Sequence, residues 1–374
     1  MKKIVLKAYK MRFYPTEEQK ILLAKTFGSC RFIYNHILAW RKEAYEKDKN
    51  KINFSEASRE LTKVKKEYEW LNEVSVVALQ QELRNQEKAY SNFFSGRARF
   101  PKFKSRYDNN YSFNLTKNAF KYINGQLFIA KSVKVPLDVK WSYGELPSQP
   151  SSITISKDAS GRYFVSCLCE TEIEELPISS KTTGIDLGLK DLYITSDGLK
   201  GKNGKFTKRY AKRLARLQRK LSRMKKGGSN YTKMRLKIAK THAKVSDSRR
   251  DALHKATSNL VKTYQIISTE TLKVKNMIKN KKLAKHIADA SWGEFVRQLE
   301  YKASWFGRNI VKIEQFYPSS KTCSCCGHVL EELKLSVRHW VCPSCKTEHD
   351  RDINAALNIH KRGLEIFNCK ALAA

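Results

Sequence analysis

Four cysteines near the carboxyl end constrain the fold more than any other feature of the chain. Cys323 and Cys326 form one Cys-x-x-Cys pair and Cys342 and Cys345 another, with fifteen residues between the pairs. This spacing is typical of a four-thiolate zinc site, because each pair delivers two sulfurs from one tight turn and two turns complete a tetrahedron. We therefore expect a structural zinc site. Cys325 is an extra thiol that could compete for the metal, although the standard spacing favours Cys326.

The charge of the chain is strongly one-sided. It has 73 Lys and Arg residues against 36 Asp and Glu, a formal net charge of +37 over 374 residues. Such an excess favours a polyanionic partner, most simply a nucleic acid. No membrane partner is expected, since no segment approaches the roughly eighteen apolar residues that a spanning helix needs.

The amino terminus and the remaining cysteines favour a cytoplasmic, nucleoid-associated protein. The opening residues MKKIVLKAYKM lack the apolar stretch of a secretion signal. Five cysteines lie outside the zinc spacing, an odd number that argues against a disulfide framework: Cys30, Cys167, Cys169, Cys325 and Cys369. We expect a reducing compartment and a monomeric chain.

Residues 1–13 are predicted to form a strand, and the chain from residue 15 to 95 to be largely helical. Thr16 to Gln19 matches a capping box, and apolar periodicity continues to Ile37 with a break at Gly28 and Ser29. Two helices meeting at a turn are therefore predicted. They fit a DNA-binding helix-turn-helix and a plain helical hairpin equally well.

Two neighbouring stretches carry side chains suited to nucleic acid. Residues 75–94 read as an amphipathic helix, and the amide and guanidinium groups on its polar side are of the kind that reads base edges, although they are also ordinary surface groups. In residues 96–106, basic residues alternate with two phenylalanines, as in a surface that follows a backbone and stacks on bases; the alternative is an ordered loop with both rings in the core. The candidate contact residues are Gln80, Arg84, Arg99, Lys102 and Lys104.

From residue 111 to 170 the apolar pattern changes to a period of two, which is typical of strands. Asn124-Gly125 and Ser160-Gly161 are typical hairpin turns between such strands. A small antiparallel sheet or barrel is predicted here, with a domain boundary near residues 174–182.

Residues 200–250 contain twenty Lys or Arg residues and a single acid, Asp247. The pattern predicts a long basic helix, a break at Gly227-Gly228 and a second helix from Tyr231. We expect the first helix to contact a phosphate backbone through residues that recur at helical spacing: Arg213, Arg216, Arg219, Lys220 and Arg223.

Three isolated acids lie within or at the ends of predicted elements. Asp186 sits inside an apolar strand between two glycines, Glu270 ends another strand, and Asp352 opens the last helix. Carboxylates that converge from separate elements suit hard divalent ions, and two Mg²⁺ ions, or Mn²⁺, could bridge a scissile phosphate there. Taken alone, Asp186 could also be a structural aspartate bonded to backbone at a strand end.

These motifs together resemble the TnpB family, the accessory nucleases of certain bacterial insertion sequences and relatives of the type V CRISPR effectors. The resemblance extends over nearly the whole chain. It rests on YPTEEQK…FGSCRFIYN, RARFPKFKSR, GIDLGL…SDG, STETLKVKNM, and SSKTCSCCG…CPSC followed by DRDINAALNI.

The resemblance implies an α+β multidomain protein with a RuvC-like (RNase H-type) nuclease core, an inserted zinc ribbon, a β-barrel wedge domain and a helical recognition domain. It implies a wedge domain at residues 1–14 and 96–176 and a recognition domain at 15–95. The nuclease domain would span 180–320 and 350–374, and the ribbon 321–349.

The resemblance also implies a function, RNA-guided cleavage of double-stranded DNA beside a short flanking motif, with a guide RNA from the transposon end. Asp186, Glu270 and Asp352 would be the catalytic, metal-binding acids. Asp350 lies two residues before Asp352, but the acid ahead of x-Asn-Ala-Ala is the one that the motif selects.

Two alternatives stay open at this point. A transposase would itself join strands with similar carboxylate chemistry, although the chain has no Tyr nucleophile beside a paired-His motif and no closely spaced final Asp–Glu pair. A guided DNA-binding repressor would use the acids only for structure; the retention of all three argues against that reading.

Overall fold

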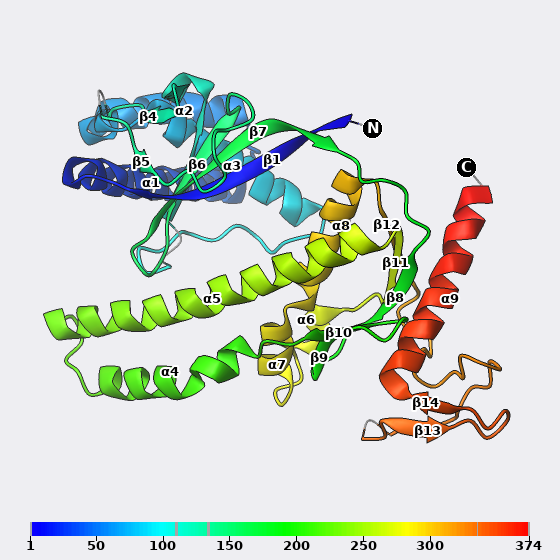
Figure 1. Ribbon diagram of the computed structural model, residues 1–374. Helices are drawn as coiled ribbons and strands as arrows, with labels where there is room; N and C mark the ends of the chain where they lie inside the picture. Colours follow the sequence, from blue (N-terminus) through cyan, green and yellow to red (C-terminus); the bar gives the residue numbers. More distant parts are fainter. Residues whose placement is uncertain (1, 109–110, 133–134, 335, 373–374) are drawn as a thin grey trace. The chain divides into compact units, whose positions relative to one another are not determined.

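The computed structural model describes residues 2–108, 111–132, 135–334 and 336–372 (Figure 1). The chain divides into two compact units, an amino-terminal unit of residues 4–172 and a carboxyl-terminal unit of residues 173–374 with residues 1–3. Met1, the expected start of the first strand, and residues 373–374 of the expected nuclease domain lie outside the described residues.

The amino-terminal unit contains an open five-stranded sheet in the order β2-β6-β7-β1-β5. Its strands are β1 (Lys2–Tyr14), β2 (Tyr111–Thr116), β5 (Asp138–Val139), β6 (Ser152–Lys157) and β7 (Tyr163–Glu174). The described residues form no closed barrel, so the barrel prediction is wrong for this part of the chain. One edge strand, β5, pairs through only two residues, which is too short an edge to close a barrel against β2.

A separate hairpin joins β3 (Phe120–Ile123) to β4 (Gln126–Ile129). Its turn residues Asn124 and Gly125 both have positive φ, 50° and 73°. A two-residue turn of this kind requires that conformation, so the predicted hairpin turn is confirmed.

The helices of the same unit are α1 (Glu17–Asp48), α2 (Phe54–Glu67), a short 3₁₀ helix η1 (Glu69–Glu73) and α3 (Val76–Phe94). The capping box is confirmed: Thr16 Oγ1 accepts a hydrogen bond from the Gln19 N–H at 3.2 Å. The predicted break at Gly28 is wrong, because α1 continues through it. A glycine inside a helix costs about 1 kcal/mol, and residues buried on both sides of it, Leu23 and Ile33 among them, offset that cost.

The carboxyl-terminal unit is built on a mixed sheet in the order β10-β9-β8-β11-β12. Its strands are β8 (Thr182–Asp186), β9 (Asp191–Thr195), β10 (Lys200–Lys202), β11 (Ile266–Thr269) and β12 (Asn309–Lys312). β10, β9 and β8 are antiparallel neighbours, whereas β8, β11 and β12 run parallel. The carboxyl ends of β8 and β11 therefore lie at the same edge of the sheet.

One face of this sheet packs on helices α5 (Ser229–Thr263) and α8 (Trp292–Phe306), through Ile185, Ile267 and Phe295 among others. The other face is covered by the final helix, α9 (Arg351–Leu372), drawn in red beside β8 and β11 in Figure 1. The zinc-ribbon segment lies between β12 and α9 and contains the two-stranded hairpin β13 (His339–Val341) and β14 (Glu348–Asp350).

The basic segment forms two helices, as predicted. α4 (Phe206–Ser222) and α5 pack side by side after a turn at Gly227, whose φ is 84°. α5 begins at Ser229, two residues before the predicted start. Two short helices, α6 (Val274–Met277) and α7 (Ala284–Ala290), follow β11.

Candidate active site and metal centre

Two glycines let α9 lie directly on the sheet. A Cβ atom added to Gly184 of β8 would lie 2.2 Å from the carbonyl oxygen of Ala356 in α9. A Cβ added to Gly363 of α9 would lie 1.9 Å from Ser268 Oγ of β11. Only a hydrogen atom fits at each of these positions, so glycine is required at both points for the helix to lie this close to the sheet.

This contact sets the register between α9 and β8. A second contact joins the same two elements, since Thr182 Oγ1 lies 2.8 Å from His360 Nε2. From this contact to the one between Gly184 and Ala356, the strand advances by two residues while the helix goes back by four. Two residues of a strand span about 6.6 Å and four residues of a helix about 6 Å, so β8 and the antiparallel α9 advance by nearly the same length. One further step sets Asp186, at the end of β8, beside Asp352 in the first turn of α9.

Glu270 reaches the same region from the neighbouring strand. It directly follows Thr269, the last residue of β11, and β11 runs parallel to β8. Ser268 faces α9, and side chains two residues apart in a strand point to the same side. The alternation therefore directs Glu270 toward the face that carries Asp186.

The acids interact electrostatically. Burial, together with the negative charges of Glu270 and Asp352, raises the pKa of Asp186 to about 8, against the opposing effect of Arg351 and Arg338. The structure thus brings together the three acids that the sequence singles out. A carboxyl group with such a pKa is held in surroundings that disfavour its ionised form until a cation enters.

Glu270 has its own hydrogen-bond partner. Burial raises the pKa of its carboxyl group, while the Ser319 hydroxyl, which donates to Glu270 Oε1 at 3.1 Å, acts to lower it. Ser319 lies in the segment between β12 and the first cysteine pair, so it could not be linked to Glu270 from the sequence.

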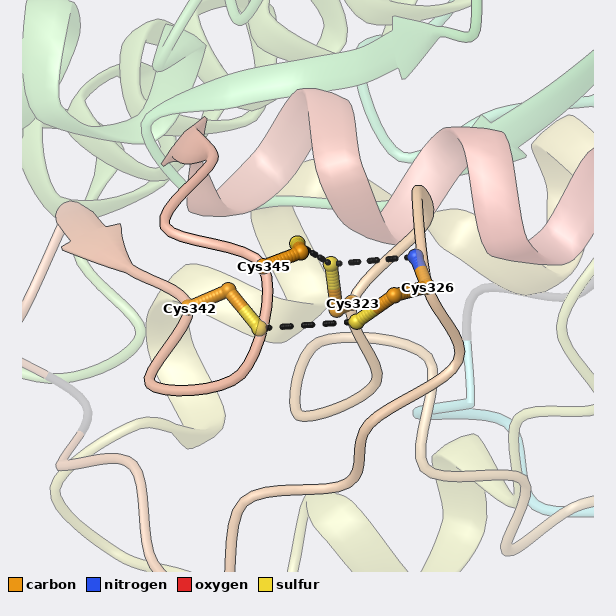
Figure 2. Close-up of side chains that lie close together, drawn as sticks. All are labelled: Cys323, Cys326, Cys342 and Cys345. Carbon is orange, nitrogen blue, oxygen red and sulfur yellow. Dashed lines mark hydrogen bonds between the residues drawn. The ribbon is translucent and has the colours of Figure 1, made fainter.

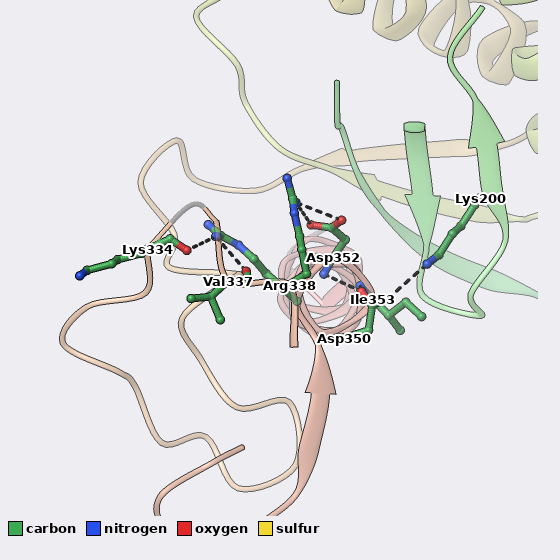
Figure 3. Close-up of polar contacts among 8 residues, drawn as sticks. Lys200, Lys334, Val337, Arg338, Asp350, Asp352 and Ile353 are labelled. Atoms are coloured by element: carbon green, nitrogen blue, oxygen red, sulfur yellow. Dashed lines mark hydrogen bonds and ion pairs between the residues drawn. The ribbon is translucent and has the colours of Figure 1, made fainter. Parts of the chain in front are cut away.

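Asp350 and Asp352 have different partners at the start of α9 (Figure 3). Asp350 Oδ1 accepts hydrogen bonds from the backbone N–H groups of Asp352 and Ile353, at 3.0 and 3.2 Å, and its other oxygen pairs with Lys200. Asp350 therefore caps the helix. Asp352 instead forms an ion pair with Arg338, at 3.1 Å, just before β13.

The acid site is open rather than a closed ligand cage. Within the described ranges, the acids Asp186, Glu270 and Asp352 do not form a group whose ligand oxygens all lie within 4.8 Å of one another. The ion pair with Arg338 turns the carboxylate of Asp352 toward the ribbon.

The four cysteines of the predicted zinc site do form such a group, with all sulfurs within 4.8 Å of one another (Figure 2). Cys323 Sγ lies 3.6 Å from Cys345 Sγ, and Cys326 Sγ lies 3.6 Å from Cys342 Sγ. A tetrahedron with Zn–S bonds of about 2.3 Å has edges of about 3.8 Å, so the sulfurs fit a zinc ion. Cys325 is exposed and outside the group.

Two asparagines of α9 fasten the ribbon to the helix. Asn354 accepts a hydrogen bond from the Ser324 N–H at 2.9 Å and donates to the Thr322 carbonyl at 2.8 Å. Asn358 donates to the carbonyls of Ser319 and Thr322, at 2.8 and 2.6 Å. These asparagines belong to the recognised DRDINAALNI stretch, but their partners are visible only in the structure.

The basic residues predicted on α4 all point to solvent: Arg213, Arg216, Arg219, Lys220 and Arg223 are exposed, while Leu214 on the opposite side is buried. The start of α4 is held by an acid that no sequence signal singles out. Asp289 of α7 accepts hydrogen bonds from the Thr207 N–H and from Arg249 of α5, at 3.0 and 2.6 Å.

The candidates in the amino-terminal unit differ in their surroundings. Arg99 and Lys102 are exposed, and Arg84 lies with its guanidinium carbon 5.0 Å from the ring centre of Phe54. Lys104 is engaged internally, because it pairs with the buried Glu82.

Gln80 lines a cavity of about 380 Å³ together with Lys65 and Lys66. The two aromatic rings of the basic loop are largely exposed, 41% for Phe100 and 51% for Phe103, which excludes the alternative that they fill the core.

No helix in the described ranges is long and apolar enough to cross a membrane.

Three family models match parts of the chain. "Cas12f1-like, TNB domain" matches residues 292–359, "Probable transposase" residues 165–281 and "Helix-turn-helix domain" residues 1–50. In the last of these ranges the structure has a strand and the single long helix α1.

Two of the curated relatives match almost the whole chain, and a third matches about a third of it. A protein of Streptomyces pristinaespiralis named "Putative RNA-guided DNA endonuclease" is 44% identical over 98% of this chain and 91% of its own. "Putative RNA-guided DNA endonuclease InsQ" of Escherichia coli K12 is 31% identical over 97% of this chain and 94% of its own. "TnpB-like protein L79" of Acanthamoeba polyphaga mimivirus is 32% identical over 34% of this chain and 25% of its own.

A solved structure shares the architecture. The protein chain in "Cryo-EM structure of the Cas12f1-sgRNA-target DNA complex" aligns with a TM-score of 0.60 over 96% of this chain and 99% of that one, at 14% identity. At that identity the match shows the fold alone, an α+β multidomain fold like that of Cas12f1. With the full-length relatives at 44% and 31% identity, it follows that the chain belongs to the TnpB family.

Proposed function

We propose that this protein is an RNA-guided DNA endonuclease that hydrolyses target DNA at the site formed by Asp186, Glu270 and Asp352. The observation that carries this proposal is the docking of α9 on β8 and β11 through Gly184 and Gly363, which brings one acid from each of three elements to the same edge of the sheet. The guide RNA and the DNA substrate in this proposal are taken from the names of the two full-length relatives, both putative RNA-guided DNA endonucleases.

The three carboxylates fit a hard divalent cation, Mg²⁺ or Mn²⁺. Their oxygens are the ligands that such ions prefer, and burial together with the charges of Glu270 and Asp352 raises the pKa of Asp186, as expected where acids share a poorly solvated site. When bound, the metal would supply an activated water and charge stabilisation at the scissile phosphate. Of the chain's own residues, Ser319 would orient Glu270, and Arg338 would orient Asp352 through their ion pair.

The four-cysteine centre would hold a structural Zn²⁺. Four thiolates leave no open position for substrate, and the centre is fastened to α9 by Asn354 and Asn358. The ribbon would therefore stabilise the start of the helix that carries Asp352, and take no part in the hydrolysis.

The same proposal assigns roles to the parts of the chain. The mixed sheet with α9 is the RuvC-like core of residues 180–320 and 350–374, and residues 321–349 are the ribbon. Residues 1–14 and 96–176 would form the wedge domain, an open sheet rather than a barrel, and residues 15–95 the recognition domain. The exposed basic face of α4 would bind the backbone of RNA or DNA.

A plasmid-cleavage assay tests the function. RNA that copurifies with the protein is sequenced, its guide segment is matched to a target plasmid, and cleavage is measured in Mg²⁺ with wild type and with Asp186→Asn. We expect cleavage only with a matched guide and only in wild type. Cleavage by D186N at the wild-type rate would overturn the assignment of the acids. Equal cleavage of targets that match the guide and targets that do not would overturn RNA guidance.

The same assay separates the alternatives. The family model over residues 165–281 is described as a transposase, so joining of transposon ends by this protein alone would favour strand transfer. Stable, guide-dependent binding of the target without strand breaks would favour a repressor.

A further inference from the structure

A histidine outside the four-cysteine group contacts one of its sulfurs. His349 Nε2 lies 3.1 Å from Cys323 Sγ, and the side chains of both residues are buried. The ring of His349 packs on Trp340, with 4.6 Å between ring centres. Trp340 lies directly opposite His349 in the β13–β14 hairpin.

The chemistry of the contact fixes the donor. A zinc-bound thiolate has no proton to give, so in the zinc-loaded ribbon the Nε2–H of His349 would donate to Cys323. Four thiolates around Zn²⁺ carry a net charge of about −2. A buried charge of this kind is costly unless N–H groups donate to it. Hydrogen bonds of this kind to metal ligands tune both the orientation of the ligand and the affinity for the metal.

The histidine also stands at the junction between the ribbon and the acid site. β14 contains His349 and Asp350 and leads directly into α9, where Asp350 caps the helix and Asp352 occupies its first turn. The Arg351 N–H donates to the Arg338 carbonyl at 2.8 Å, which fastens the partner of Asp352 to the same hairpin. A displacement of His349 would therefore be transmitted over only three residues to Asp352.

We propose that His349 is a positioning residue that donates a hydrogen bond to the Cys323 thiolate and couples zinc binding to the position of Asp352. The first half concerns the ribbon alone. The second half rests on the proposed function, because it takes Asp352 as a ligand of the divalent metal.

Two substitutions separate the hydrogen bond from the packing. His349→Phe keeps an aromatic ring against Trp340 but removes the N–H donor, whereas His349→Gln keeps a donor at the end of its side chain. Zinc affinity is measured on the full-length chain by competition with a chromophoric chelator, and the thiolate-to-metal absorption bands are recorded with Co²⁺ in place of zinc. Neither measurement needs guide RNA or DNA.

We expect H349F to bind zinc about 10- to 100-fold more weakly than wild type and to shift the Co²⁺ bands, and H349Q to restore both toward wild type. Wild-type affinity and an unshifted spectrum in H349F would overturn the hydrogen bond. If H349F does not fold, His349→Met, which fills the space without an N–H, decides by the same two measurements.

The coupling is tested by Mn²⁺ binding, followed by electron paramagnetic resonance at saturating zinc. We expect weaker Mn²⁺ binding in H349F than in wild type or H349Q, with D186N removing the site in every background. Equal Mn²⁺ affinity in H349F and wild type would overturn the coupling. Mn²⁺ binding that is unchanged by D186N would instead overturn the proposed acid site. The zinc affinity and Co²⁺ spectra of the His349 variants would still decide the role of His349.

Discussion

At the scale of single residues, Asp186 and Asp350 show how position decides what a carboxyl group contributes. Burial, Glu270 and Asp352 raise the pKa of Asp186 to about 8. Burial also acts to raise the pKa of Asp350, but the Ile353 N–H and Lys200 outweigh it, so the net shift is downward. The folded protein thus favours a protonated Asp186 and an ionised Asp350.

These shifts predict opposite pH dependences. Between about pH 4 and 8 the folded metal-free protein keeps a proton on Asp186 that the unfolded chain has lost, so this residue lowers the free energy of unfolding as pH rises. Asp186→Asn removes this effect and should stabilise the zinc-loaded protein at pH 8, in magnesium-free buffer, on the order of 1 to 3 kcal/mol relative to wild type. Urea unfolding at pH 5 and pH 8 measures it; a D186N protein less stable than wild type at pH 8 would contradict it.

Asp350→Ala is the matched control. The depressed pKa of Asp350 means that its contribution is present at neutral pH and is lost as pH falls through its folded pKa. Removing the cap should cost about 0.5 to 2 kcal/mol at pH 7 and less in acid. A D350A variant that is stabilised at pH 7 would contradict the assignment of Asp350 as the cap.

The chemistry of single residues was largely predictable, and their partners were not. The spacing of the cysteines identified Cys326 rather than Cys325, and the acids stood out as isolated charges in or beside apolar strands and at a helix start. Arg338, Ser319 and His349 were missed because each acts through a contact between elements that local sequence does not encode. Asp350 could have been recognised as a cap, since Asp is a preferred residue at helix starts.

At the scale of elements, the docking of α9 is the feature on which the acid site depends. Gly184→Ala would place a methyl group 2.2 Å from the Ala356 carbonyl oxygen, so α9 must move away from β8. Overpacking of this kind costs roughly 1–3 kcal/mol. We expect G184A to lower thermal stability and to lose most DNA cleavage.

Gly293→Ala provides the comparison within the same unit, because a Cβ there meets no atom within 4 Å. That substitution, in the first turn of α8, should leave stability unchanged or increase it by up to about 1 kcal/mol. Differential scanning calorimetry of both variants measures the difference. Equal stability of G184A and G293A would show that α9 is not held against β8 as described.

The sequence predicted whether a segment forms a helix or a strand better than it predicted where that helix or strand begins and ends. The period-two stretch became strands, and the basic stretch became two helices with the break at Gly227. The misplaced break at Gly28 shows the weakness of local signals: a glycine is tolerated in a helix whose neighbouring turns are buried. The sequence shows Asp186 between two glycines, but α9 as the partner of Gly184 is visible only in the three-dimensional structure.

At the scale of the whole molecule, the charge excess gathers on exposed helices such as α4. Replacing Arg213, Arg216 and Arg219 with Gln should weaken nucleic-acid binding. It should also reduce the slope of log affinity against log salt by about 2 to 3, if each residue neutralises one phosphate. Filter binding with the copurifying RNA between 50 and 200 mM salt measures the slope.

The control variant also loses three positive charges, but from residues that are already paired with an acidic side chain. Lys255, Arg297 and Lys312 are each ion-paired, with Asp251, Glu294 and Glu300. Replacing these three with Gln should change the salt slope little. An equal loss in both triple variants would mean that net charge, and not the face of α4, governs binding.

The order of the sheets could not be predicted, because strand neighbours far apart in sequence are chosen by packing over the whole unit. β8 and β11 are adjacent although the long helices α4 and α5 and two further strands lie between them in the sequence. This adjacency brings Asp186 and Glu270 to the same edge of the sheet. The family resemblance supplied the expectation of such a core; the residues alone supplied only the three acids.

The most direct test is to locate the divalent metal. Crystals of the zinc-loaded protein with its guide RNA are soaked in Mn²⁺, and anomalous differences are recorded with those of zinc as an internal reference. We predict Mn²⁺ bound to carboxylate oxygens of Asp186, Glu270 and Asp352, and its absence from D186N crystals. Zinc in the ribbon with no Mn²⁺ at the acids, or Mn²⁺ that persists in D186N, would contradict a metal site built by the docking of α9.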